Sequence, residues 1–145
     1  MTRAAALAFA LLAPGCLVPE EPCVLHIDPT FTSDEHAAIV DAIAQWDAVG
    51  ADRAACVSVR RAPAYDSEGR RVWGLGAPGW VRIDPDAPAT VFRALVLHEL
   101  GHHAGGDHHD GDGVLRATIS HDSRQCITPD DVRAVGLRGP GTCPL

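Results

Sequence analysis

Apolar residues at helical spacing predict an amphipathic helix of about 15 residues between Thr32 and Gly50. Thr32 and Glu35 have the spacing of a capping box, with Ser33 as a rival N-cap, and Gly50 suits a helix end. The apolar positions recur four and three residues apart, at Ile39, Ile43 and Trp46. Acidic residues fill the other face, so we expect the apolar face to pack on a core.

Short runs of alternating apolar and polar residues predict strands elsewhere in the chain. The predicted strands cover residues 24–27, 56–60 and 80–84, and residues 71–73 are a candidate for a further short strand. The polar segment 63–69 predicts a loop. The Gly- and Pro-rich segment 74–79 is not predicted to form a strand.

Two more helices are predicted in the second half of the chain. The first runs from about Thr90 to Ala104 and is apolar on nearly every side, which is typical of a helix in the middle of a core. The second begins after Thr128, which suits the N-cap, and has Pro129 at its first position. The resulting order, β-α-β-β-α-loop-α, indicates an α/β (α+β) fold with a small twisted mixed sheet packed on two main helices.

Composition and charge limit the classes of function. The chain has 145 residues, the length of one domain, and its 46% hydrophobic and 21% charged residues are a globular composition. Its 19 acidic residues outnumber the 12 Lys and Arg, for a formal net charge of −7. This balance argues against nucleic-acid binding and against electrostatic docking on anionic lipid. We expect a monomer.

The N-terminal residues are typical of an export signal, because Arg3 precedes an apolar run that is too short to span a bilayer. The small residue before Cys16 resembles the cleavage box of a bacterial lipoprotein, in which Cys16 carries the lipid; an ordinary signal peptide is the alternative. We therefore expect a signal peptide at 1–15, a tether at 16–22 and one domain at 23–145.

Separating Cys16 leaves four cysteines, and an even number in an exported chain favours two disulfides over free buried thiols. Cys23 and Cys56 each precede a strand of the first β-α-β unit, which is typical of a parallel crossover. The starts of parallel strands lie at the same edge of a sheet, so a Cys23–Cys56 disulfide is geometrically reasonable. Cys126 and Cys143 would then tie down the last helix.

The clearest chemistry lies on and after the second long helix. His98 and His102 are one helical turn apart and project from the same face, where two imidazoles suit adjacent corners of a zinc tetrahedron. Glu99 lies beside the metal, within reach of a zinc-bound water. Gly105 ends the helix, so the chain reverses and brings His108 back as a third ligand. Three protein ligands leave a position for water, as in catalytic zinc sites.

Other residues of the same loop offer alternatives. His109 is a rival third ligand, although the Gly-x-x-His spacing favours His108. Asp107, Asp110 and Asp112 could bind Ca²⁺ or orient a ligand histidine. They lack the full spacing of a calcium loop, so a solvated acidic turn is the better interpretation.

The His-Glu-x-x-His-x-x-Gly-x-x-His pattern resembles that of the metzincin zinc endopeptidases, and the order of elements most resembles the matrixin-like branch. The resemblance implies a zincin-like fold in which His98, His102 and His108 bind one zinc ion and Glu99 is the general base. It also implies an edge strand along which an extended peptide lies antiparallel. Leu115 stands where the family has the methionine of a turn below the zinc, a volume-conserving apolar replacement.

These observations predict an exported zinc-dependent endopeptidase acting on a peptide or protein, held in the bacterial cell envelope by lipid on Cys16 or otherwise secreted. Two alternatives stay open: a non-catalytic zinc-binding envelope lipoprotein or pseudo-peptidase, and a zinc hydrolase acting on a non-peptide bond. The replaced methionine favours the non-catalytic alternative. Glu99 argues against it, because metal binding alone does not require a glutamate there.

Replacing Cys16 with Ser tests the predicted anchor. Without the thiol no lipid can be attached, so we expect the protein to move from the membrane fraction to the soluble fraction of fractionated cells, as followed by immunoblotting. Continued recovery in the membrane fraction would show that Cys16 does not anchor the chain.

Overall fold

Two of the described helices begin at capping boxes, and the long helix between them lies in the core. The computed structural model describes residues 23–51 and 54–144, so the predicted signal peptide (1–15), Cys16 and the tether (16–22) lie outside the described residues. The helices are α1 (Ser33–Ala48), η1 (Ala89–Val91), α2 (Phe92–His103) and α3 (Pro129–Ala134). Both predicted N-caps, at the starts of α1 and α3, are confirmed and complete capping boxes.

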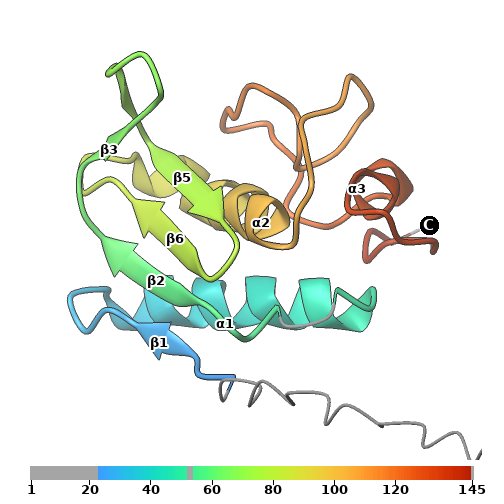
Figure 1. The fold of residues 1–145 in the computed structure, drawn as a ribbon, viewed down its shortest axis with the longest axis horizontal. Helices are drawn as coiled ribbons and strands as arrows, with labels where there is room; N and C mark the ends of the chain where they lie inside the picture. The colour runs from blue at the N-terminus through green and yellow to red at the C-terminus, as the bar shows by residue number, and fades with distance from the viewer. Residues whose placement is uncertain (1–22, 52–53, 145) are drawn as a thin grey trace, which may run out of the picture.

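A four-stranded sheet with strand order β1-β2-β6-β5 lies against the two long helices (Figure 1). Its strands are β1 (His26–Ile27), β2 (Ser58–Arg61), β5 (Gly74–Ala77) and β6 (Trp80–Ile83). β1, β2 and β6 run parallel, which confirms the predicted crossover through α1, and β5 lies antiparallel to β6 at the edge. The protein is therefore a mixed α/β fold with a small sheet and a few helices.

Two segments differ from the sequence prediction. Residues 74–77 form β5, although glycines have a low preference for strands. The strand forms because it pairs with β6 on one side and meets α2 on the other, where glycine allows a close approach. Residues 63–69 were predicted as a loop, but β3 (Ala64–Tyr65) pairs with β4 (Arg71–Val72) in a separate two-stranded hairpin.

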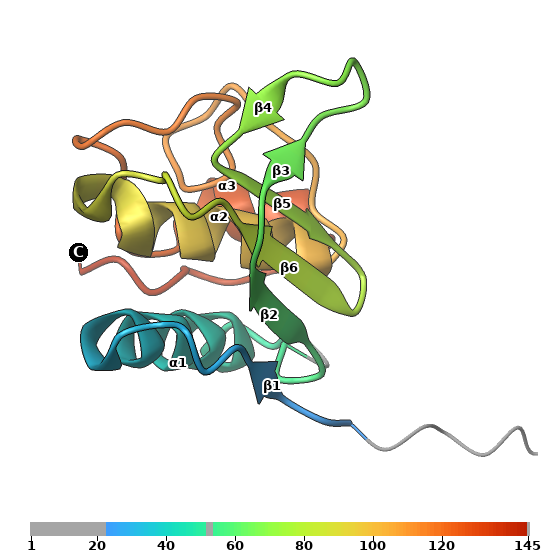
Figure 2. The same cartoon turned by 90° about the vertical axis from the view of Figure 1, so that its left-hand side faces the viewer.

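The core lies between the sheet and the helices α1 and α2, which Figure 2 shows on one side of the sheet. All residues of α2 except Arg93 and His102 are buried, as its uniformly apolar sequence predicted. Trp46 of α1 is fully buried against α2, and its indole Nε1 donates a hydrogen bond to the carbonyl of Leu97 at 2.9 Å. This bond fixes the two helices relative to each other at the level of the functional residues described below.

Two disulfides, Cys23–Cys56 and Cys126–Cys143, confirm the predicted pairing. The second holds the C-terminal segment beside the start of α3, where the Cys143 N–H also donates to the carbonyl of Ile127. Two disulfides in a small domain are typical of proteins outside the reducing cytosol. Among the described helices, none combines the length and the apolar character needed to cross a membrane.

Removing the second disulfide should weaken the fold measurably. The cysteines are 17 residues apart, and opening a loop of this size in the unfolded state costs about 3 kcal/mol of stability. We expect the double substitution Cys126→Ser and Cys143→Ser to lower the free energy of unfolding by about that amount in urea titrations. A loss well below about 1 kcal/mol would contradict a stabilising role for this bond.

Candidate metal centre

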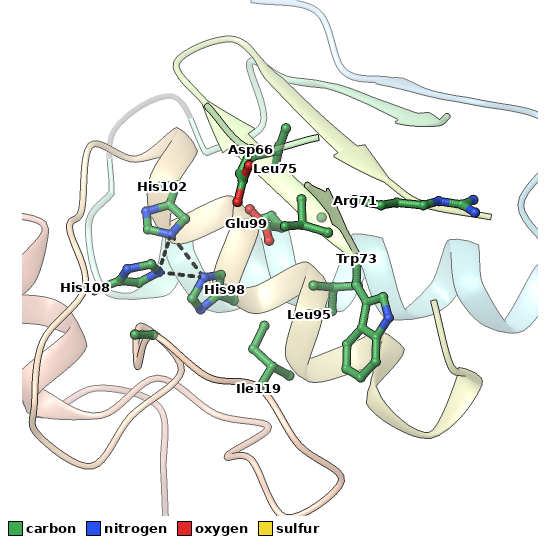
Figure 3. A pocket seen from close by; sticks show the side chains of 14 residues that line it. Asp66, Arg71, Trp73, Leu75, Leu95, His98, Glu99, His102, His108 and Ile119 are labelled. Carbon is green, nitrogen blue, oxygen red and sulfur yellow. Dashed lines mark hydrogen bonds between the residues drawn. The ribbon is translucent and has the colours of Figure 1, made fainter. Parts of the chain in front are cut away.

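Three histidines bring their Nε2 atoms together at the end of α2 (Figure 3). His98 and His102 come from α2, and His108 comes from the loop after it. The Nε2 atoms of His98 and His102 are 3.0 Å apart, and that of His108 is 3.2 Å from each of them. Within the described parts of the chain this is the one group that could hold a metal ion, and its members are the three predicted ligands.

Hydrogen bonds on the other ring nitrogens point two of the Nε2 lone pairs inward. His98 Nδ1 lies 2.7 Å from the carbonyl oxygen of Val114, and His102 Nδ1 lies 2.8 Å from that of Gly106. A carbonyl only accepts, so each Nδ1 carries the proton and each neutral ring presents a bare Nε2. Bare lone pairs at this distance repel, and a cation between them removes the repulsion. In a tetrahedral zinc site each nitrogen ligand lies about 2.0–2.1 Å from the ion, which places the nitrogens about 3.3 Å from one another. The distances between the three Nε2 atoms are close to this value, so the three histidines fit such an ion.

The surroundings keep these imidazoles in the form that binds metals. Burial, together with the neighbouring His102 and His108, lowers the pKa of His98 to about 4. Burial, followed by His102, also lowers the pKa of His108. Both rings are therefore neutral at neutral pH, and neutral imidazole is the ligand form.

The reversal of the chain after α2 follows from two glycines. Gly105 has φ +90°, a conformation that side chains oppose, as predicted for this position. Its N–H donates to the carbonyl of His102, and the Gly106 N–H donates to that of Gly101, which together form a Schellman motif. A Cβ atom on Gly106 would lie 2.8 Å from Leu115 Cδ1, so a larger residue would not fit there. Gly106 is a requirement that the sequence analysis did not identify.

Leu115 forms a buried apolar floor under this end of α2. It is fully buried, and a Cβ atom on Gly101 would lie 2.6 Å from Leu115 Cδ2. The preceding residue, Val114, supplies the carbonyl that orients His98. Leu115 therefore lies in the turn that supports the histidines, and its equivalence to the methionine of the family's turn stays a prediction.

Asp131, at the start of α3, is an important residue that the sequence analysis missed. Its fully buried carboxylate accepts hydrogen bonds from the N–H groups of Val114 (3.1 Å) and Leu115 (2.8 Å), from the N–H and hydroxyl of Thr128 (both 2.8 Å), and from His109 Nε2 (2.9 Å). Burial raises the pKa of Asp131, but the hydrogen bonds from Leu115 and Thr128 outweigh burial and hold the pKa below its usual value. Its place in the capping box was the only sequence signal that pointed to it.

This carboxylate is connected to the metal ligands by two routes. The N–H of Val114 donates a hydrogen bond to Asp131, and the carbonyl of Val114 accepts one from His98 Nδ1. Asp131 therefore holds the residue whose carbonyl orients His98. His109 is hydrogen-bonded to Asp131 and is the neighbour of His108 in sequence, so the same carboxylate fastens the loop of the third ligand. His109 is accordingly not part of the three-histidine group, and His108 is.

Glu99 and the three histidines line one cleft of about 590 Å³. The Glu99 side chain is only 4% exposed, and burial raises the pKa of its carboxyl to about 8. Figure 3 shows the carboxylate between the histidines and β5. The rest of the lining is mainly apolar or backbone and includes Val72, Trp73, Gly74, Leu75, Leu95 and Ile119.

The acidic residues of the loop after α2 do not form a calcium site. Asp107 and Asp110 are exposed, and Asp112 forms an ion pair with Arg124. No group of acidic residues that could hold a metal ion occurs in the described ranges. The calcium alternative is therefore not supported, and a solvated acidic loop remains.

Comparison with known proteins adds no relative. No protein-family model matches the chain, and none of the curated proteins matches it significantly. The chemistry of the site has to be argued from its residues.

We expect the three histidines to bind one divalent transition-metal ion per chain. Loss of any one imidazole should weaken binding by more than the roughly 10–100-fold that follows loss of an outer hydrogen-bond partner. His98→Ala, His102→Ala and His108→Ala should therefore lose the metal in equilibrium dialysis followed by elemental analysis. His121→Ala, which removes an exposed imidazole, is the matched control and should bind like the wild type. Unchanged binding by all three variants would place the metal elsewhere.

Asp131→Asn should destabilise the fold in a pH-dependent way. The amide turns an NH₂ group toward hydrogen-bond donors, so the free energy of unfolding should fall by about 1–3 kcal/mol at pH 7. Because the folded-state pKa of Asp131 is below its usual value, its ionised form stabilises the fold above about pH 4, and this stabilisation is lost as the pH falls through the folded-state pKa. The difference between wild type and variant in urea titrations should therefore shrink in acid. A difference independent of pH, or an equal loss for the exposed control Asp122→Asn, would contradict this role.

Proposed function

We propose that the protein is a zinc-dependent endopeptidase with a zincin-like fold, similar to the metzincins. The observation that carries the proposal is the convergence of three imidazoles beside a carboxylate in one cleft. Three nitrogen ligands with tetrahedral spacing suit zinc, and a ligand set of three leaves a coordination position for water or substrate. Three further features support the resemblance: His98 and His102 lie on one helix, a turn at Gly105 and Gly106 follows it, and Leu115 is buried beneath it.

Each residue of the site has a separate role in this reaction. His98, His102 and His108 hold the metal. When bound, zinc supplies a Lewis acid that polarises a carbonyl and makes water more acidic. Glu99 accepts a proton from the attacking water and donates it to the leaving amine. Burial raises the pKa of Glu99, which makes its carboxylate a stronger base. The positive charge of a bound zinc ion would oppose this shift and favour the ionised form, which can accept the proton.

The cleft also suits an extended peptide. β5 is an edge strand of the sheet, and Gly74, Leu75 and Gly76 line the cleft. The free side of an edge strand can hydrogen-bond to a peptide backbone, which provides binding without a sequence requirement. Trp73, which is 43% exposed, lines the same cleft and offers apolar surface for a substrate side chain.

The rest of the proposal concerns location and partners. The two disulfides hint at an exported protein, and the lipid anchor on Cys16 remains a prediction from the sequence. The proposed substrate is a peptide or protein outside the cytosol, and the proposed active form is a monomer.

A non-catalytic zinc-binding protein is the second candidate. The observation that favours it is the depth of Glu99, which is 4% exposed and covered by β5. A glutamate that could not reach water beside the metal would leave a binding site without a base.

Glu99→Gln separates the two candidates. The amide keeps the size of the side chain but cannot accept the proton, so hydrolysis of a peptide library should fall at least about 100-fold while one zinc per chain is retained. Glu68→Gln makes the same change at an exposed position and should cleave like the wild type. If the wild type holds zinc but cleaves no more than Glu99→Gln, the non-catalytic candidate is correct.

A further inference from the structure

β5 meets α2 at Glu99 with no side chain between them. Positions 74 and 76 share the face of β5 that meets α2, because alternate residues of a strand point to the same side, and both are glycine. A Cβ atom on Gly74 would lie 2.6 Å from Glu99 Oε1, and one on Gly76 would overlap the Glu99 backbone carbonyl. The bare backbone of the strand therefore covers Glu99.

The strand is kept close to the helix by its pairing with β6 and by the turn that joins β5 to β6. β5 pairs with β6 through Gly74–Ile83 and Gly76–Val81. At the turn between the two strands, the Gly79 N–H donates to His103 Nδ1 at 2.9 Å. His103 is buried and lies one helical turn after Glu99, on the same side of α2. The pairing with β6 and this hydrogen bond thus set the separation between strand and helix.

The two glycines differ in what a side chain would meet. At Gly76 the obstacle is the backbone of α2, so a larger residue would force the strand and the helix apart. At Gly74 all three nearest atoms belong to the Glu99 side chain, at 2.6–2.9 Å. That side chain can rotate, so a methyl group at position 74 would move the carboxylate and leave the backbone in place.

We infer that Gly74 is a positioning residue for Glu99, because its lack of a side chain keeps free the space in which the carboxylate lies beside the three histidines. This inference rests on the proposed function where it concerns catalysis. A displacement of a reacting group by about 1 Å costs on the order of 100-fold in rate. The smallest possible addition, one methyl group on β5, therefore affects hydrolysis although it touches no metal ligand.

The test combines Gly74→Ala with Glu99→Ala and measures melting temperature, zinc content and peptide hydrolysis. Gly74→Ala should keep its zinc, melt below the wild type, and lose about 100-fold in kcat with a smaller change in KM. In the Glu99→Ala background the vacated space accepts the methyl, so Gly74→Ala should cause no further loss of melting temperature. Gly139→Ala is the matched control, because a Cβ atom there meets nothing closer than 3.9 Å.

The outcomes separate this inference from the proposed function. An equal loss of melting temperature in both backgrounds, or failure of both Gly74 variants to fold, overturns the inference, because the methyl would then meet something other than the Glu99 side chain. An unchanged kcat in Gly74→Ala also overturns it. Absence of cleavage by the wild type overturns only the proposed function, since the dependence of melting temperature on both residues is measured without substrate.

Discussion

The structure depends on one constraint, which is that polar side chains of a buried helix need partners inside the core. α2 is apolar on nearly every side, yet it carries histidines and a glutamate into the interior, where an unpartnered polar group is costly. His98 is satisfied by the carbonyl of Val114 and His102 by that of Gly106. Their remaining nitrogens meet at the three-histidine group. The segment after α2 folds back to supply these partners, so loop and helix form one unit.

The support of this unit extends to the C-terminal helix. Asp131 accepts hydrogen bonds from the N–H groups of Val114 and Leu115. The same residue is part of the capping box at the start of α3. The Cys126–Cys143 disulfide closes the chain just before that cap. A short helix of six residues would be marginal alone, so cap, disulfide and buried carboxylate stabilise one another. The three-histidine group is therefore supported by a helix that contributes none of its members.

Local physics explains what could be predicted. The helix N-caps, the spacing of His98 and His102, and the turn at Gly105 depend on residues within about one or two helical turns of each other. The disulfide partners followed from the order of the elements and the parallel crossover. The strand β5 could not be predicted, because Gly74 and Gly76 have a low preference for strands and are required only by the neighbouring helix.

The sequence by itself determined the three candidate ligands, the candidate base and the order of the main helices, because helical periodicity and the backbone freedom of glycine act over short distances. Only the tertiary structure decided which carbonyl orients His98, since Val114 is 16 positions away. It also decided that Asp131 anchors the supporting turn and that Gly74 leaves room for Glu99. Hydrogen bonds and steric contacts between distant segments leave no periodic pattern in a chain, and they become visible only when those segments pack together.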